Sequence, residues 1–454
     1  MAGTASVIEN LPLVEGKVST STKLAYSLGH IFNDLAAAMW FSYTLIYLQR
    51  VALLEPVTAG ALLLLGQIVD ALMTPVFGIL VDRYNKKKIW HVIGSVMVTL
   101  SFPVIFGGFM EPSSSAVMIV YVFSITLFQI GWAAVQISHL SMIPSLARSL
   151  LGRAELTAIR YSAQVAAAVI VFIVTWIVLP TNEEVVVQLG PQDDYKFRNI
   201  VLVLTSLGLT ATFFFHLFLK AHLLESEKTT TSGKSNSETT RLLEEQENDL
   251  GTDRSETRNK LSLSILLSVA LLYVASRLFI TLATVYLPLY IEESEVGGKQ
   301  ALATVPLVSY LSSFAAALLL KYINRSCGTK MCYFLGGLIG IAAAVITEFA
   351  GSNVGVVYTV AALIGAGSSI TMVTALSVTA EIIGSQTEKS AFVYSVVTFL
   401  DKVVTGVVVI LIENWRCREK ELCPNYNRDT LSIVCSSSMI LGLITLISVT
   451  RCLR

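Results

Sequence analysis

Long apolar segments recur along the whole chain, and short polar stretches separate them. A helix that crosses a membrane needs about 20 mostly apolar residues, and twelve stretches of this kind are present. Their approximate bounds are 24–48, 57–81, 89–110, 116–143, 155–180, 199–222, 261–291, 299–323, 331–351, 354–383, 389–413 and 430–450. The polar–apolar alternation of membrane β-strands is absent. The pattern therefore predicts an all-α membrane protein with twelve transmembrane helices.

The composition agrees with this prediction and excludes other classes of protein. Of the 454 residues, 54% are apolar and only 14% are charged, whereas soluble domains carry about 25% charged residues. A disordered protein and an ordinary soluble enzyme are therefore excluded. Thirty-two basic residues balance thirty-two acidic ones, so no net positive field is available to attract nucleic acid.

The distribution of Lys and Arg predicts which helix ends face the cytosol, because basic residues are enriched in cytosolic loops. With the N-terminus in the cytosol, the cytosolic segments and the span ends beside them hold 21 Lys and Arg, and the opposite segments hold 8. We therefore expect cytosolic tails at both ends of the chain, over 1–23 and 451–454.

One long polar segment divides the predicted helices into two sets. Residues 223–260 are rich in Ser, Thr, Glu and Asn and contain few apolar residues, which is typical of a disordered segment. This interpretation gives an N-terminal six-helix bundle over 24–222, a cytosolic linker over 223–260 and a C-terminal six-helix bundle over 261–450.

Polar residues inside and beside the helices recur at an offset of 242 positions. This offset relates Arg83 to Arg325, Lys88 to Lys330, Arg160 to Lys402, and His139 to Glu381. Several matches at one offset favour a duplicated six-helix unit. Parallel repeats of this kind build transporters whose substrate site lies between the halves, near the bilayer midplane.

The loop after the second helix has the sequence GILVDRYNKKK over 78–88. It resembles the loop signature of the major facilitator superfamily, with Asn85 in place of a second Gly. We expect a cytosolic clamp, in which Asp82 caps or pairs with a neighbouring helix end and the basic residues contact the anionic leaflet. The alternative is a short positive-inside loop without a special role. The expected loop and gating residues are Gly78, Asp82, Arg83, Lys88, His139 and Glu381.

Charged residues inside the predicted helices are the strongest functional signal, because each costs about 2.5–3.5 kcal/mol on insertion scales. They come from different helices of both halves, so they can converge only on a shared cavity. Of the adjacent Asp401 and Lys402, we expect only Lys402 to face it. The alternative for any single charge is a structural ion pair between two helices. The expected substrate-binding residues are Asp34, Asp70, Arg160, Arg277, Lys402, Gln67, Gln136, Asn33 and Gln164.

Longer segments resemble the glycoside–pentoside–hexuronide/cation symporter branch of the same superfamily. These segments are 70–78, 136–144 with Arg160 downstream, and 399–402. Segments 28–35, 128–132, 136–141 and 399–402 are also similar to a subfamily of lysosomal and melanosomal membrane transporters. This resemblance implies the major facilitator fold and a carrier that brings cysteine from the cytosol into the organelle by alternating access.

One departure from the symporter branch bears on the coupling ion. Melibiose-type members bind the cation with acidic residues in the second and fourth helices, where this chain has Asp70, Thr74 and Gln136. Without the other carboxylates, a sodium ion loses the attraction that offsets its dehydration. We therefore expect no sodium coupling, and a proton on Asp70 or Asp34, or uncoupled transport, stays open.

Intramembrane charges of both signs suit a zwitterion. Asp34 and Asp70 are available for an ammonium group, and Arg160 or Arg277 for a carboxylate held by two parallel hydrogen bonds. A neutral sugar would not need so many charges. Cysteine as the particular amino acid is implied by the resemblance alone.

The polar linker also contains an acidic dileucine pattern, carried by Glu238, Leu242 and Leu243. Clathrin adaptor complexes read such segments as short extended peptides. The expected location is therefore the membrane of lysosomes and melanosomes, and the expected partners are adaptor complexes, membrane lipids and a small-molecule substrate of a monomeric carrier.

Cys417 and Cys423 fall on the predicted lumenal side, where an oxidising space would allow a disulfide between them. Two free thiols are the alternative. The sequence shows no Gly-rich phosphate loop, zinc-ligand spacing or catalytic triad, so we expect neither an enzyme nor an ATP-driven pump, and no cofactor or metal site.

Two other functions remain open from the sequence. The same architecture would serve a carrier of a sugar or a lysolipid. A non-transporting receptor or scaffold built on a transporter fold belongs to a different class, and it would tolerate neutralisation of the intramembrane charges.

Overall fold

The computed structural model describes residues 18–84, 86–108, 116–147, 150–179, 189–219, 263–295, 297–349, 353–383, 387–416 and 423–452. Within these ranges every regular element is a helix. The expected linker over 223–260, with its dileucine pattern, lies outside the described residues, as do Asn85 and Cys417.

The N-terminal half of the chain, called the N half, contains the first eight α-helices and two short helical turns. They are α1 (Thr20–Leu28), α2 (Ile31–Ile46), the π-helical turn η1 (Tyr47–Val51), α3 (Pro56–Tyr84), α4 (Lys87–Phe106), α5 (Ala116–Leu140), α6 (Met142–Leu146), α7 (Leu150–Val178), the 3₁₀ turn η2 (Pro191–Asp193) and α8 (Asp194–Phe218). The long helices agree with the six expected spans to within a few residues.

The C-terminal half, called the C half, contains six long helices. They are α11 (Leu263–Glu293), α12 (Gly298–Cys327), α13 (Thr329–Phe349), α14 (Val354–Ile383), α15 (Thr387–Trp415) and α16 (Tyr426–Cys452). Within the described residues, ten helices of the chain are long and apolar enough to cross a membrane. The other two expected spans correspond to the interrupted helix α1–α2 and to α15, so the predicted all-α membrane fold is confirmed.

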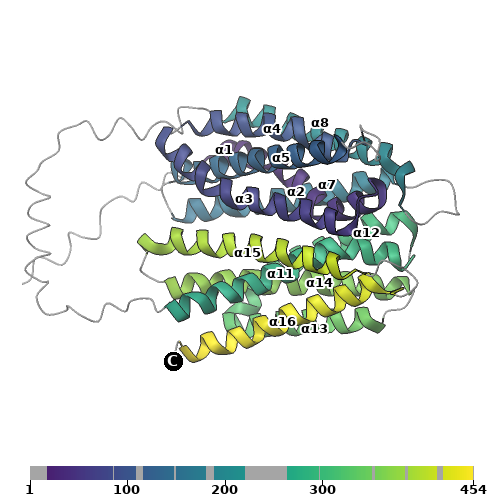
Figure 1. The fold of residues 1–454 in the computed structure, drawn as a ribbon. Coiled ribbons are helices and arrows are strands. Elements are labelled where there is room, and N and C mark those ends of the chain that lie inside the picture. Colours follow the sequence, from purple (N-terminus) through teal and green to yellow (C-terminus); the bar gives the residue numbers. More distant parts are fainter. Residues whose placement is uncertain are drawn as a thin grey trace, which may run out of the picture.

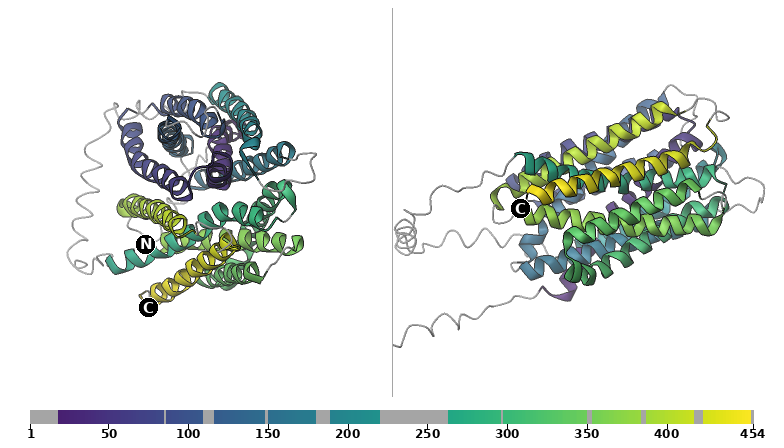
Figure 2. Two further views of the ribbon diagram at one scale, coloured as in Figure 1. Left: turned by 45° about the vertical axis from the view of Figure 1, so that its right-hand side comes forward. Right: turned by 90° about the horizontal axis from the view of Figure 1, so that it is seen from below.

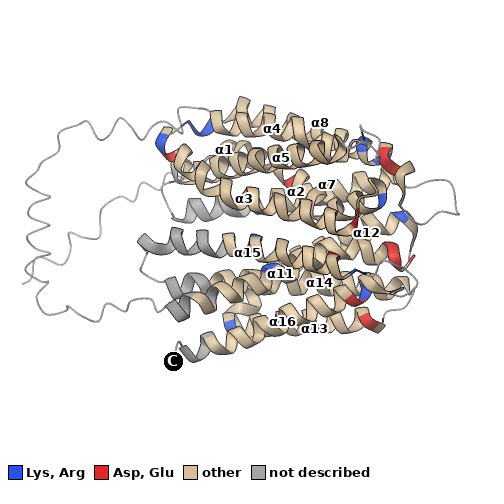
Figure 3. Cartoon of the chain, viewed as in Figure 1, with Lys and Arg blue, Asp and Glu red and all other residues tan. Residues whose placement is uncertain are grey.

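The two halves lie side by side with their helices running roughly parallel (Figures 1 and 2). One end of the bundle, called the linker face, carries the start of α1, the end of α8, the start of α11 and the end of α16 (Figure 1). The opposite end is called the far face. Charged residues gather toward the two ends, and only a few lie midway along the helices (Figure 3).

The helices are packed around a continuous apolar core, and the halves meet along a few specific helix pairs. The pairs across the interface are α2 with α11, α3 with α15, and α7 with α12. Arg50 and Glu292 are 242 positions apart and form an ion pair of 2.8 Å across the interface. Residues at equivalent positions of two repeats can meet only close to the axis that relates them, so this contact supports the duplication inferred from the sequence.

The first membrane-crossing helix is broken between α1 and α2, at Gly29 and His30. Two histidine side chains donate to carbonyls at the break: His91 Nε2 to Gly29 O (2.6 Å), and His139 Nε2 to Tyr26 O (2.8 Å), which also accepts from the Gly29 N–H (3.1 Å). A Cβ atom at Gly29 would lie 2.6–2.7 Å from ring carbons of Phe215 and His139. The break is therefore closely packed, and it sets His30 and Asp34 at the start of α2, next to the interior of the molecule.

Candidate functional site

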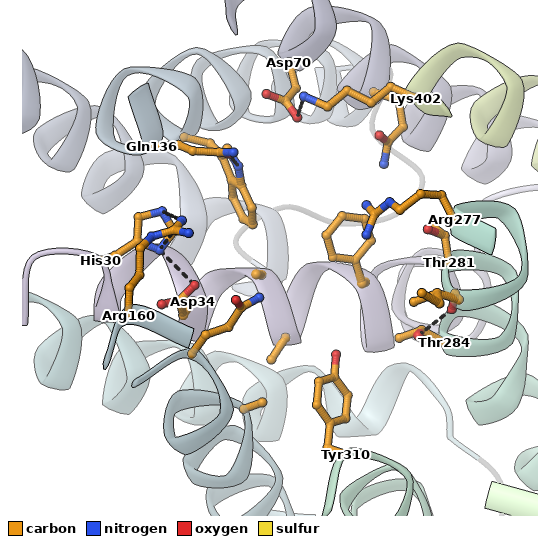
Figure 4. A pocket seen from close by; sticks show the side chains of 18 residues that line it. His30, Asp34, Asp70, Gln136, Arg160, Arg277, Thr281, Thr284, Tyr310 and Lys402 are labelled. Carbon is orange, nitrogen blue, oxygen red and sulfur yellow. Dashed lines mark hydrogen bonds and ion pairs between the residues drawn. The ribbon is translucent and has the colours of Figure 1, made fainter. Parts of the chain in front are cut away.

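A cavity of about 380 Å³ lies between the two halves, and it is lined by residues of α2, α3, α5, α7, α11, α12 and α15. This volume falls in the range of small-molecule sites, about 300–1,000 Å³. All five charged residues that the sequence singled out, Asp34, Asp70, Arg160, Arg277 and Lys402, line this one cavity (Figure 4). These charged side chains, which come from both halves, therefore share one void.

A linear cluster of three side chains forms the N-half wall of the cavity. Arg160 NH2 lies 3.0 Å from His30 Nε2, and His30 Nδ1 lies 2.9 Å from Asp34 Oδ1. Because a guanidinium has only donors, His30 Nε2 accepts from Arg160, and the neutral ring donates its Nδ1 proton to Asp34. Gly29 and the helix break place His30 at this point, so the imidazole connects the cation of α7 to the carboxylate of α2.

An ion pair joins the two halves across one side of the cavity. Lys402 of α15 places its Nζ 2.5 Å from Asp70 Oδ2 of α3, as Figure 4 shows. Thr74, one turn after Asp70, donates from Oγ1 to the Asp70 carbonyl (2.8 Å) and lies 3.2 Å from Oδ1. Both carboxylate oxygens of Asp70 are therefore engaged by this chain's own side chains.

The C-half wall presents Arg277 together with neutral polar groups. Arg277 Nε donates to Asp401 Oδ2 at 3.0 Å, and Asp401 itself is buried and does not line the cavity. Thr281, Thr284 and Tyr310 complete the wall with hydroxyl groups (Figure 4). Asp401 thus supports Arg277 from behind, while the next residue, Lys402, faces the cavity.

The charges around the cavity balance. The three cations Arg160, Arg277 and Lys402 are matched by the three carboxylates Asp34, Asp401 and Asp70, respectively, directly or through His30. A buried charge without a partner is costly, so a ligand with a net charge would upset this balance. A ligand with one positive and one negative group would replace a contact of each sign.

The neutral residues expected at the site are mostly placed there as well. Gln67, Gln136 and Gln164 line the cavity, and Gln136 accepts a hydrogen bond from Trp132 Nε1 at 2.9 Å. Asn33 does not line it: its amide donates to the carbonyl of Trp132 at 3.1 Å and is fully buried against α5. Successive residues of a helix point about 100° apart, which turns Asn33 away from the face that carries Asp34.

Several lining residues were not singled out by the sequence. They are Ala37, Ala38, Phe41, Ala168, Ile280, Thr281, Thr284 and Tyr310. Small, aromatic and hydroxyl residues are ordinary in membrane helices, so no sequence signal marks them. His30 and Trp132 also line the cavity: His30 lies one helical turn before Asp34, and Trp132 belongs to a segment that carries the family resemblance.

At the linker face, the expected clamp has a different composition. Asp82 and Arg83 are exposed at the end of α3, and among the described residues no hydrogen bond or ion pair joins Asp82 to a helix end. Lys88 does this instead, because its Nζ donates to the carbonyls of His216 (3.2 Å) and Leu219 at the end of α8. A lysine satisfies free carbonyls at a helix C-terminus well, so the basic part of the motif performs the capping.

The other expected gating residues lie in different surroundings. His139 is fully buried inside the N half, where it stacks on Tyr26 with ring centroids 4.1 Å apart and caps the end of α1. Gly78 has open space where a Cβ atom would stand. Glu381 belongs to α14, but its side chain lies outside the part of the structure that is described.

The far face is sealed by polar contacts between the halves. Lys299 of α12 donates to both oxygens of the buried Asp193, at 2.9 and 2.8 Å, and Lys196 also pairs with Asp193 at 3.0 Å. Gln49 Nε2 donates to Glu413 at 2.9 Å, next to the Arg50–Glu292 pair. These contacts hold the two halves together at the far face. Cys423, at the same face, is disulfide-bonded.

Solved structures with the same arrangement of helices include a sugar transporter. The inward-open xylose transporter XylE from E. coli matches with a TM-score of 0.66 at 11% identity, over 95% of both chains. The tetrameric PepTSo2 structure matches with a TM-score of 0.67 at 11% identity, over 96% of this chain and 98% of that chain. Identity this low shows the shared fold alone.

Sequence comparisons identify the family. The chain is 37% identical to the major facilitator superfamily domain-containing protein 12 of Homo sapiens, over 89% of this chain and 87% of that protein. The Mus musculus protein of the same name matches at 37% over the same shares. The family model described as MFS/sugar transport protein matches residues 25–414. With this match over most of its length, the chain belongs to the major facilitator superfamily of secondary transporters, within the MFS/sugar transport protein family.

Proposed function

We propose that this protein carries a small zwitterionic amino acid, cysteine, from the cytosol into lysosomes and melanosomes by alternating access. The transporter class follows from the family. The choice of cysteine and of the organelles rests on the resemblance of four segments to the cysteine-transporter subfamily.

The balanced cavity is the observation that supports a zwitterion. Its N-half wall offers Asp34 and Arg160, its C-half wall offers Arg277, and Asp70–Lys402 lies between them. In the proposed complex the substrate carboxylate binds Arg160 or Arg277, and the substrate ammonium group binds Asp34 or Asp70. Since the substrate adds no net charge, the cavity remains balanced when it is occupied.

Sodium coupling is not part of the proposal. Asp70 has the Lys402 ammonium group on one oxygen, where a cation would otherwise be attracted. The proposed cycle is either coupled to a proton or uncoupled.

The sealed far face is proposed to be the lumenal face. The loop counts of Lys and Arg favour a cytosolic linker face, and the proposed cycle takes up substrate from that side. Opening of the far face then requires the breaking of the Asp193–Lys299 and Arg50–Glu292 pairs, which the closing of the linker face must compensate.

Counterflow in liposomes that contain the purified full chain tests the substrate class. Liposomes loaded with unlabelled cysteine should accumulate external radiolabelled cysteine, and excess external cysteine should abolish this signal while hexoses and lysolipids leave it unchanged. Replacement of sodium by choline should have no effect. Inhibition by a hexose would favour the sugar-carrier alternative, and the absence of counterflow with any solute would favour a scaffold.

The proposed lysosomal location can be tested separately in cells. Changing Leu242 and Leu243 to Ala is expected to move most of the protein from lysosomes to the cell surface, because the apolar pair is the part of an acidic dileucine signal that enters the adaptor's pocket. Surface biotinylation gives the measurement. Changing Thr239 and Thr240, inside the same segment, to Ala provides the matched control and should leave the location unchanged. Lysosomal location that persists without the leucine pair would contradict the proposed signal.

A further inference from the structure

Among the described residues, one buried oxygen of an intramembrane carboxylate lacks a hydrogen-bond partner. Asp34 Oδ1 accepts from His30, but Asp34 Oδ2 is buried and has no hydrogen-bond partner among the described residues. Asp34 is only 3% exposed, although it forms part of the cavity wall. A buried carboxylate oxygen without a donor costs free energy, so this position favours the arrival of either a proton or a donor from the cavity.

The groups around Asp34 do not supply that donor. His30 uses its Nδ1 on Oδ1 and faces Arg160 with Nε2. Behind His30 lies His139 of α5, with ring centroids 5.5 Å apart, and its Nε2 is directed to the Tyr26 carbonyl. The nearest cation, Arg160 of α7, thus reaches Asp34 only through His30, and Oδ2 is left for an incoming group.

We infer that Asp34 Oδ2 is the exchange site of the carrier, at which the ammonium group of the amino acid and a proton bind in alternation. This inference rests on the proposed amino-acid transport. In the empty carrier a proton forms an O–H bond at Oδ2, so the charges around the cavity balance only after this proton has left. When the substrate arrives, its N–H donates to Oδ2, the O–H bond breaks, and the proton leaves to water in the cavity.

The charge balance then fixes the direction of coupling. The zwitterion adds no net charge, so the proton-loaded carrier has one more positive charge than the substrate-loaded carrier. Each cycle therefore moves one amino acid in one direction and one proton in the other. For a lumen one pH unit more acidic than the cytosol and no membrane potential, one-for-one exchange concentrates the amino acid in the lumen about tenfold.

Proton release on binding tests the site directly in the full chain. The purified protein is mixed with L-cysteine in weakly buffered solution containing a pH-sensitive dye, and binding is measured in parallel by calorimetry. We expect up to one proton released per cysteine bound, and none with 3-mercaptopropionate, which is cysteine without its amine. Binding of cysteine with no proton release at any pH between about 5 and 8 would overturn the inference.

Two variants test whether the released proton comes from the Asp34 carboxyl group. Asp34→Asn should abolish proton release, whereas Asp429→Asn, which changes a half-exposed carboxylate at the far face, should behave as the wild type. Persistent release from a folded Asp34→Asn protein would contradict the assignment. If the Asp34→Asn variant does not fold, the inference is tested by comparing proton release on binding of L-cysteine and of 3-mercaptopropionate to the wild type.

Transport measurements separate this inference from the proposed function. In liposomes, an acidic interior should accelerate cysteine uptake and drive accumulation above the outside concentration. Counterflow that is intact while an acidic interior slows uptake would refute exchange and leave amino-acid transport standing. The absence of both binding and counterflow of cysteine would overturn the proposed function, and the exchange site with it.

Discussion

Replacing Asp70 by Asn is expected to reduce the rate of counterflow about 10²- to 10³-fold. The change leaves the Lys402 ammonium group without its carboxylate inside the membrane, and the loss of one partner of a buried ion pair costs about 3–5 kcal/mol. Lys402→Met should have a comparable effect, because it leaves Asp70 with only the hydroxyl of Thr74 beside it. Uptake per folded carrier, quantified by fluorescence-detected size exclusion, gives the measurement.

The charge-swapped double variant Asp70→Lys with Lys402→Asp provides the control. If the pair acts as a unit across the interface, the double variant should recover activity to within about tenfold of the wild type, since coupled residues are not additive. Full activity in both single variants would show that the ion pair has no role in transport. Losses that simply add in the double variant would show that each residue acts separately.

The positions of the helices could be predicted from the sequence because a membrane helix needs a fixed length of apolar residues. Every expected span has a helix within a few residues of it. The first span differs from the expected single helix, because it is broken at Gly29 and His30. No proline marks the break, and the apolar pattern continues across it. What holds it is the pair of donors from His91 and His139, which are remote in the sequence.

The charged residues of the site could be predicted, but their partners could not. Charge inside a span is rare enough to be informative, and so Asp34, Arg160 and Arg277 were recognisable. The pairing of Asp70 with Lys402 joins residues that are far apart in the sequence, and it depends on how two helices of different halves face each other. Asn33 shows the opposite kind of error. It was expected to line the cavity because it is polar and lies next to Asp34, but its side chain packs against α5.

The far face shows why loop charges are easily overlooked. Before the fold is known, Asp193 and Lys299 are charges near span ends and indicate only topology. In the folded chain they are buried together, with Lys299 8% and Asp193 1% exposed. Burial makes each of the two charges costly without the other, because a buried charge that loses its partner is no longer compensated by water. The fold thus joins the two halves at the far face through charges that the sequence alone did not single out.

Replacing Asp193 by Asn is expected to shift the carrier strongly toward the state that is open at the far face. The substitution leaves Lys299 and Lys196 close together without the carboxylate that binds both. A cost of about 3–5 kcal/mol falls on the sealed state alone, if the pair separates when that face opens. A free-energy change of this size alters the ratio of the two states about 10²- to 10⁴-fold.

Distances between two spin labels give this ratio directly. Labels at the exposed far-face positions Leu53 and Trp415, one in each half, should move to a longer mean distance in Asp193→Asn than in the wild type. The matched control Asp194→Asn changes the neighbouring carboxylate, which makes no bond to Lys299 within the described part of the chain, and should retain the short distance. An unchanged distance distribution in a folded Asp193→Asn protein would mean that this ion pair does not hold the far face closed, and that the remaining contacts of Arg50 and Gln49 are sufficient.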